Sequence, residues 1–151
     1  MTDWNAAFKE LEALYAELAE DIKWSNPLCV ASGNCCNFTQ AGHELWTTPL
    51  EFEYLVRHES LDRPMTADDC PFLTADRKCG VRDHRMFGCR VYFCDKQYFK
   101  NHMTRIHEKF FPRIKRIMRD HDIPYEYFRF MDRIGERLAP PVPPEATPLS
   151  R

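Results

Sequence analysis

Cysteine is the residue type with the clearest potential for chemistry in this sequence. Seven of the 151 residues are cysteines, spaced as C-x5-C-C and then, after 33 residues, as C-x8-C-x9-C-x4-C. Turn-forming residues between Cys29 and Cys36 predict a loop, and helical periodicity is poor from Cys70 to Cys94. Thiolates that bind a metal need backbone able to direct several sulfurs to one point, whereas cysteines buried as small hydrophobic residues usually lie on helix or strand faces. The pattern predicts a metal site with the candidate ligands Cys29, Cys35, Cys36, Cys70, Cys79, Cys89 and Cys94.

Disulfide bonds and unrelated buried thiols are the alternative uses of these cysteines. The sequence begins Met1-Thr2-Asp3-Trp4-Asn5, without the basic start and apolar run of a secretory signal. We therefore expect a cytoplasmic protein whose thiols stay reduced. Seven is also an odd number, so complete pairing within one chain would leave one thiol over.

The spacing leaves open whether the metal is zinc or an iron-sulfur cluster. Zinc ribbons and knuckles use closely spaced C-x2-C pairs, which this sequence lacks. Cys35 and Cys36 are adjacent, and on extended backbone their side chains would point apart, which suits a polynuclear centre better than one zinc ion. Iron-sulfur ligand spacings vary widely, however. We therefore expect an iron-sulfur cluster or zinc as the cofactor.

Basic residues surround the second cysteine group. They could offset the negative charge of a thiolate site by contacting the ligands from behind, or they could form an ordinary solvated surface. These residues are Arg77, Lys78, Arg82, Arg85, Arg90 and Lys96.

Short motifs around the cysteines resemble a known family. The segment CVASGNCC from Cys29 to Cys36 is similar to the opening motif of the YkgJ-type cysteine-cluster proteins, also described as CxxCxxCC zinc- or iron-chelating domains. Ser32 stands where that motif has its second cysteine. The segment CPFL at Cys70 and the segment CGV at Cys79 are similar to the next two family elements.

The last of these motifs completes the resemblance, which spans about residues 29–94. The segment RMFGCR from Arg85 to Arg90 resembles the family's RPxxCR element, with Met86 in place of proline, and Arg82 stands where the family has tyrosine. The resemblance implies a metal-chelating domain. Some relatives carry iron-sulfur oxidoreductase labels, and the domain also occurs with flagellin lysine methylation, so the resemblance does not specify one activity.

Hydrophobic periodicity predicts helices on both sides of the cysteine groups. Residues 4–22 form an amphipathic pattern capped by Asp3, and a capping box from Thr48 to Glu51 starts a helix over residues 49–58. A longer helix, capped by Asp95, is expected from about 96 to 121, with Phe99 on its inward stripe and a kink at Pro112. A short helix is expected over residues 125–138.

These elements predict a mainly α single domain over residues 1–139. It would contain a small irregular or hairpin cysteine-rich metal-binding region at 29–94, with a turn at residues 74–78, and a helical part at 95–138. Residues 140–151 form a proline-rich tail that we expect to be disordered.

The segment 96–119 suggests a less favoured function as a nucleic-acid binder. Its eight basic residues against Glu108 alone give it a net charge of +7, whereas the rest of the chain carries -9. Such a segment can bind an anionic partner or simply form a solvated face balanced by acidic neighbours. The C-x4-C-x7-H-x4-H spacing of Cys89, Cys94, His102 and His107 faintly resembles a zinc finger, but it has seven residues where a finger has about twelve.

No catalytic motif is recognisable, and we name no catalytic residue. His43 and His58, which flank the helix at 49–58, could each ligate a metal or be solvated. We expect no membrane-spanning segment. The expected function is a cysteine-bound metal or iron-sulfur centre used in redox chemistry or as an accessory to an enzyme. The alternative is a non-catalytic, zinc-stabilised module that binds an unknown protein partner.

Overall fold

The computed structural model describes residues 2–27, 44–60, 70–76, 79–93 and 95–138. These residues form a mainly helical fold, as expected, together with a small antiparallel sheet that the sequence did not predict. The elements are α1 (Trp4–Ser25), β1 (Trp46–Thr47), α3 (Pro49–His58), α4 (Phe87–Val91), α5 (Lys96–Asp120), β2 (Phe128–Arg129) and α6 (Phe130–Leu138). None of the described helices is long and apolar enough to cross a membrane. The expected tail at 140–151 lies outside the described residues.

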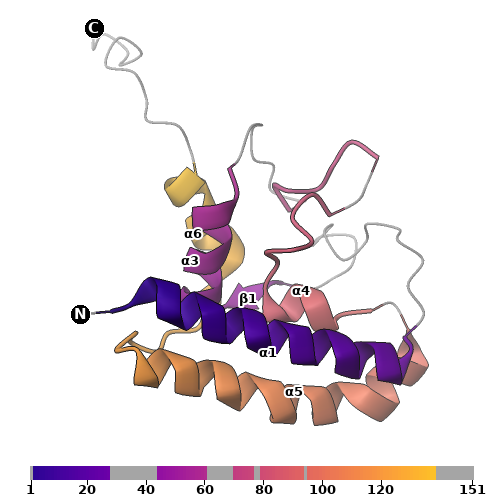
Figure 1. Cartoon of the computed structure of the whole chain (residues 1–151). Helices are drawn as coiled ribbons and strands as arrows, with labels where there is room; N and C mark the ends of the chain where they lie inside the picture. The colour runs from indigo at the N-terminus through magenta and orange to yellow at the C-terminus, as the bar shows by residue number, and fades with distance from the viewer. Residues whose placement is uncertain (1, 28–43, 61–69, 77–78, 94, 139–151) are drawn as a thin grey trace, which may run out of the picture.

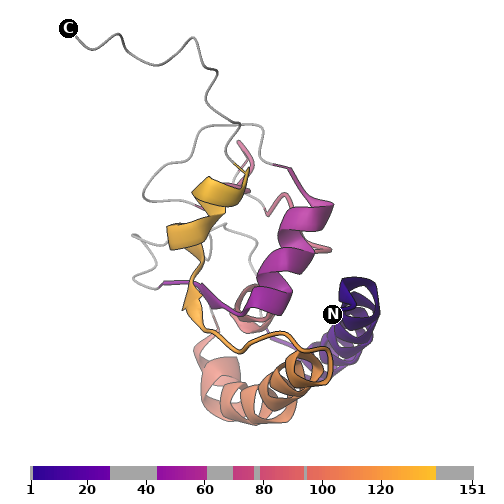
Figure 2. The same ribbon diagram turned by 90° about the vertical axis from the view of Figure 1, so that its left-hand side faces the viewer.

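The long helices α1 and α5 run antiparallel, side by side, and form the base of the molecule (Figure 1). Helices α3 and α6 lie next to each other on one side of this pair (Figure 2). The short helix α4 contacts α1, α5 and β1. Cys89, which α4 carries, is therefore held next to both the helical base and the sheet.

Helix α1 forms where the sequence predicts it. The Asp3 side chain accepts a hydrogen bond from the Ala6 backbone N–H at 3.0 Å, which satisfies one of the free amides of the first turn. The helix continues three residues beyond the expected end and stops at Ser25. Asn26 then adopts a left-handed conformation, with φ of 50°, and its N–H bonds back to the Ile22 carbonyl.

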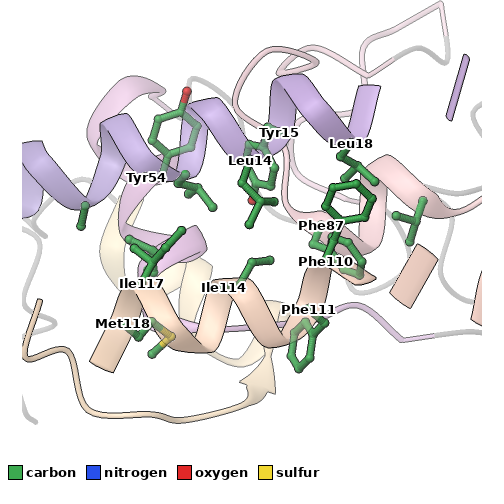
Figure 3. Close-up of a cluster of buried hydrophobic side chains, with 14 of the residues drawn as sticks. Leu14, Tyr15, Leu18, Tyr54, Phe87, Phe110, Phe111, Ile114, Ile117 and Met118 are labelled. Carbon is green, nitrogen blue, oxygen red and sulfur yellow. The ribbon is translucent and has the colours of Figure 1, made fainter. Parts of the chain in front are cut away.

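A hydrophobic core fills the space between α1 and α5 (Figure 3). Leu14 and Leu18 from α1 face Phe110 and Ile114 from α5, and all four side chains are almost completely buried. Phe87 of α4 is part of the same core. Burial of one such side chain contributes ~1.5–3 kcal/mol, so this seam is the main source of stability for the helical base.

Ion pairs along the edge of the same seam neutralise part of the basic segment 96–119. Arg105 and Lys109 both contact Asp21, at 2.8 Å and 2.7 Å. Arg113 contacts Glu17 at 2.6 Å. The Arg105 hydrogen bond is the main reason that the pKa of Asp21 is lowered. Two acidic residues of α1 therefore pair with three of the eight basic residues whose charge suggested an anionic partner.

Helix α3 confirms the predicted capping box. The Thr48 side chain accepts from the Glu51 backbone N–H, and the Glu51 side chain accepts from the Thr48 backbone N–H. Pro49 occupies the first helical position, where no backbone donor is needed. The helix ends at His58, as expected.

Helix α5 corrects one expected inward residue. Phe99 is 52% exposed, whereas the neighbouring Tyr98 is buried and donates its hydroxyl to the Val91 carbonyl at 3.0 Å. This hydrogen bond ties the first turn of α5 to the end of α4, so Tyr98 faces the core instead of Phe99. The Asp95 side chain caps the helix, as predicted, and α5 continues through Pro112 to Asp120.

The expected helix over 125–138 is wrong in its first part. Residues Phe128–Arg129 form strand β2, paired with β1 in the register Trp46 with Arg129 and Thr47 with Phe128. The Phe130 N–H then donates to the Leu45 carbonyl at 2.9 Å, and α6 begins at this residue. Backbone pairing with a segment some eighty residues away in sequence thus replaces the first turns of the helix.

Candidate metal centre

The three described cysteines line one cavity of about 240 Å³. Cys70 precedes a turn, Cys79 follows it, and Cys89 lies in the middle of α4. Cys70 is buried, whereas Cys79 and Cys89 are partly exposed. The other candidate ligands, Cys29, Cys35, Cys36 and Cys94, lie outside the described residues.

Backbone hydrogen bonds connect the residues that follow Cys70 with Cys79 and Gly80. The Leu73 N–H donates to the Cys70 carbonyl at 3.0 Å, and Leu73 forms an antiparallel bridge with Cys79. The Gly80 N–H donates to the Phe72 carbonyl at 2.9 Å. This bridge agrees with the hairpin expected around the turn at residues 74–78, of which residues 77–78 lie outside the described residues.

We expect that Gly80→Ala will destabilise the protein and reduce its metal content. An alanine Cβ at this position would lie 2.8 Å from the Phe72 carbonyl oxygen, closer than real Cβ atoms approach backbone. The turn beside Cys79 must therefore open, at a cost of ~1–3 kcal/mol. Thermal unfolding and metal analysis of the purified variant measure both effects.

Gly88→Ala is the matched control, because Gly88 immediately precedes Cys89. Its added Cβ would lie 3.0 Å from the Leu45 Cδ1 atom, which is the tip of a side chain that can rotate away. The substitution also favours a helix by ~1 kcal/mol. Equal losses in the two variants would contradict the proposed strain at Gly80.

A buried carboxylate positions the helix that carries Cys89. Glu51 is 2% exposed, and its Oε1 atom accepts from the Phe87 N–H at 2.6 Å and from the Tyr15 hydroxyl at 3.0 Å. Its Oε2 atom accepts from the Thr48 hydroxyl at 2.9 Å. Burial, the largest influence, raises the pKa of Glu51. One carboxylate therefore joins α1, the start of α3 and the first residue of α4.

The sequence pattern predicted neither α4 nor this role of Glu51. Helix α4 has five residues, which is too short for a hydrophobic period to be recognised. Glu51 was expected only to complete the capping box of α3. The capping box is a local signal in the sequence. The contacts of Glu51 with Tyr15 and Phe87 instead connect it to residues 36 positions before and 36 positions after it.

Arg90 holds the chain between Cys79 and α4. Its Nε atom donates to the Arg85 carbonyl at 2.7 Å and one Nη atom donates to the Asp83 carbonyl at 2.9 Å. Its guanidinium carbon lies 3.8 Å from the centre of the Tyr15 ring, a cation-π contact. These bonds fix the backbone that places Arg85 at the cavity.

Arg85 lines the cavity together with the cysteines. Its Nε atom is buried and has no hydrogen-bond partner among the described residues. Burial, followed by the charges of Arg82 and Arg90, lowers the pKa of Arg85, whereas Cys79 and Cys89 act in the opposite direction. Arg85 is therefore close enough to both cysteines to interact with their charge.

His58 does not line this cavity. Its ring stacks on that of His84, with centroids 4.6 Å apart, and its Nδ1 atom lies 2.7 Å from the Tyr54 carbonyl oxygen. The Nδ1 atom of His84 lies 2.7 Å from a Glu59 carboxylate oxygen. This pair attaches the segment after Cys79 to the end of α3. His43 lies outside the described residues.

Two of the residues with the zinc-finger-like spacing, His102 and His107, have different surroundings in the structure. His107 lines the cavity, whereas His102 does not and instead contacts the rings of Trp24 and Tyr98. Cys94 lies outside the described residues. Cys89 and His102 are therefore not brought to the same cavity.

The cysteines that are described do not make a complete metal site by themselves. Within residues 2–27, 44–60, 70–76, 79–93 and 95–138, no three His, Cys, Asp or Glu side chains are grouped so that they could hold a metal ion. Comparison with protein-family models, curated proteins and solved structures gives no match.

Proposed function

We propose that this protein binds zinc or an iron-sulfur cluster through cysteine thiolates at the cavity lined by Cys70, Cys79 and Cys89. The observation that carries the proposal is that cysteines on both sides of a turn and on a separate helix line one cavity. All three cysteines also belong to or pack against one hydrophobic cluster, as packed thiols would, so metal analysis decides between the two uses. Further ligands would have to come from Cys29, Cys35, Cys36 or Cys94, because no three described side chains are grouped to hold a metal and thiolate centres generally use four ligands.

The chemistry of the cavity fits such a centre. Thiolates are soft ligands that suit zinc and iron-sulfur clusters. Several thiolates around one metal carry net negative charge, and the Arg85 guanidinium beside Cys79 and Cys89 supplies the opposite charge. The other wall residues are mainly apolar, and of the three cysteines only Cys70 is buried.

The nature of the metal separates two functions. An iron-sulfur cluster would support a redox function or an accessory role to an enzyme. A single zinc ion would support the alternative, a non-catalytic module that is stabilised by the metal and binds another protein. A nucleic-acid function is less favoured because Asp21 and Glu17 pair with three cations of the basic helix.

Metal analysis of the anaerobically purified, chelator-free chain tests the proposal. We expect at least about one equivalent of bound metal, because thiolate coordination contributes directly to the folding free energy. A brown protein with broad visible absorption would identify an iron-sulfur cluster, and a colourless protein with stoichiometric zinc would identify the module. Less than about half an equivalent of zinc and iron combined would contradict the proposal.

A further inference from the structure

A strip of aromatic rings begins on the side of α5 that faces away from α1, where Figure 3 shows Phe111. Tyr127 lies 5.5 Å from Phe111, and Trp46 lies 5.7 Å from Tyr127, measured between ring centroids. Lys115 connects this aromatic strip to Tyr125, because its Nζ atom lies 5.5 Å from the centre of the Phe111 ring and 4.9 Å from that of Tyr125. Trp46, Tyr125 and Tyr127 are 40%, 52% and 45% exposed, so three rings of the strip are open to solvent.

A hollow of about 630 Å³ on the C-terminal half of α5 adjoins the aromatic strip. The hollow and the strip share Lys115 and Tyr125. No carboxylate of the described residues lines this basic hollow, whereas four cations do. These are Arg113, Lys115, Arg116 and Arg119. An anionic ligand in the basic hollow would therefore meet cations without a competing carboxylate in the wall.

Three of the four cations are available to such a ligand. Lys115, Arg116 and Arg119 are exposed. No ion pair joins Lys115 or Arg116 to another described residue. The Arg119 side chain is 75% exposed and lies 3.7 Å from Asp120, so it can turn to another anion. Arg113 is the exception, because it already pairs with α1 at 2.6 Å.

The carboxylates that are close to the strip in sequence already have basic partners. Glu126, between Tyr125 and Tyr127, accepts two hydrogen bonds from the Arg133 guanidinium. Glu44, two residues before Trp46, lies 3.3 Å from an Arg129 Nη atom. These paired carboxylates repel an anionic ligand less than free carboxylates would.

We propose that the basic hollow and the aromatic strip together bind single-stranded nucleic acid. Phosphates would contact Lys115, Arg116 and Arg119. Bases would stack against Tyr125 and Tyr127. Sites for single strands combine a basic groove that follows the backbone with rings on which successive bases stack, and this surface has both parts. An acidic peptide would use the cations but would leave the exposed rings unexplained.

This proposal goes beyond the metal centre and does not depend on it. The ion pairs that weigh against nucleic-acid binding involve Arg105, Lys109 and Arg113, which contact α1. The proposed surface uses the cations that follow them, towards the C-terminal end of α5. The pairs with α1 therefore leave this end of the helix free to bind phosphates.

The test is fluorescence anisotropy of a labelled oligothymidylate of about 12 nucleotides with the complete, anaerobically purified chain. The matched probe is an abasic strand of the same length, which keeps the phosphates and lacks the bases. We expect a dissociation constant of about 1–100 μM for oligothymidylate, and binding of the abasic strand that is at least about tenfold weaker. No saturable binding, or equal affinities for the two strands, would overturn the proposal.

Charge variants locate the phosphate contacts. The logarithm of the binding constant should fall with the logarithm of salt concentration with a slope of about -2, as expected for three phosphate contacts. Arg116→Gln and Arg119→Gln should each weaken binding about three- to fivefold and make this slope shallower by about 0.7. Arg105→Gln is the matched control, because it removes the same charge from α5 at a residue that pairs with Asp21. An equal loss in Arg105→Gln would mean that binding follows net charge alone, and would overturn the proposed site.

Ring variants locate the stacking contacts. Tyr125→Ala and Tyr127→Ala should each weaken binding of oligothymidylate about five- to tenfold and leave binding of the abasic strand nearly unchanged. Trp24→Ala is the matched control, because Trp24 is 74% exposed but belongs to α1. Thermal unfolding shows that each variant is folded. Unchanged binding in both tyrosine variants would overturn the proposal, whereas loss of metal with unchanged affinity for the strand would contradict only the metal centre.

Discussion

Glu51→Ala should lower the free energy of unfolding by ~3–5 kcal/mol, the largest effect expected for a residue that is not a cysteine. The substitution leaves the Phe87 N–H and the Tyr15 hydroxyl without their acceptor in a buried place. It also breaks the capping box at Thr48. Because Phe87 starts the helix that carries Cys89, the variant should lose metal as well. Chemical denaturation and metal analysis measure the two effects.

A surface carboxylate provides the control for this prediction. Glu17 pairs with Arg113 at 2.6 Å, but its side chain is 57% exposed. Exposed ion pairs contribute little to stability, so Glu17→Ala should leave the unfolding midpoint and the metal content nearly unchanged. A Glu51→Ala variant as stable as Glu17→Ala would contradict the central role of the buried carboxylate.

Glu51 should also give the protein a characteristic dependence on pH. Its pKa in the folded chain is raised above the ordinary value of 4.5, so between these two pKa values the folded chain binds more protons than the unfolded chain. The contribution of Glu51 to the free energy of unfolding is thus fully present below the ordinary pKa and is lost as pH rises through the raised one. Asp21 and Glu53, whose pKa values are lowered, act in the opposite direction at more acidic pH.

Comparison with Glu51→Gln isolates this contribution, because glutamine does not titrate. The stability of the wild-type chain relative to Glu51→Gln should decrease as pH rises through the raised pKa of Glu51. Denaturant unfolding of both proteins at a series of pH values measures the difference. If the free energy of unfolding of the wild-type chain minus that of Glu51→Gln stays constant or increases over this pH range, burial does not destabilise the ionised form of Glu51.

Single serine substitutions of the cysteines should have the second large effect, a loss of bound metal. Cys70→Ser, Cys79→Ser and Cys89→Ser each replace a thiol at the cavity with a hydroxyl that is much harder to deprotonate and binds soft metals poorly. Since metal binding contributes to folding, each variant should also be less stable. Metal per chain after anaerobic purification is the measurement. Full occupancy in all three variants would contradict a metal centre at this cavity.

The same series tests whether Cys94 replaces the cysteine that the family motif would have at Ser32. If it does, Cys94→Ser should lower metal occupancy about as much as Cys70→Ser, and Ser32→Ala should change it little. If Cys94 is instead a packed thiol, Cys94→Ser should cost only ~1 kcal/mol and keep the metal. Full occupancy in Cys94→Ser would therefore exclude the compensation. Both positions lie outside the described residues.

The sequence was sufficient to predict the elements whose signals are local. The caps at Asp3, Thr48 and Asp95 and the apolar period of α1 lie within a few turns of the residues that they organise, so they could be recognised without knowledge of the fold. The same local signals wrongly predicted that Phe99 faces the core. Tyr98 faces the core instead, because its hydroxyl donates a hydrogen bond to Val91 of another helix. The start of α6 was misplaced for the same kind of reason, since β2 exists only through its pairing with β1.

The candidate site was predicted by residue type and arranged by tertiary contacts. Cysteines on segments without helical periodicity indicated thiolate chemistry, because ligand type depends on the side chain alone. The expectation of irregular backbone was wrong for Cys89, which lies in helix α4. Only the fold decided that Cys70, Cys79 and Cys89 share a cavity, and that Arg85 and Trp46 line it with them. Such neighbours come from hydrogen bonds and packing between distant segments, which leave no periodic trace in the sequence. The expectation of metal chemistry thus came from composition and spacing, whereas the cavity that the cysteines share with Arg85 and Trp46 came from the tertiary structure.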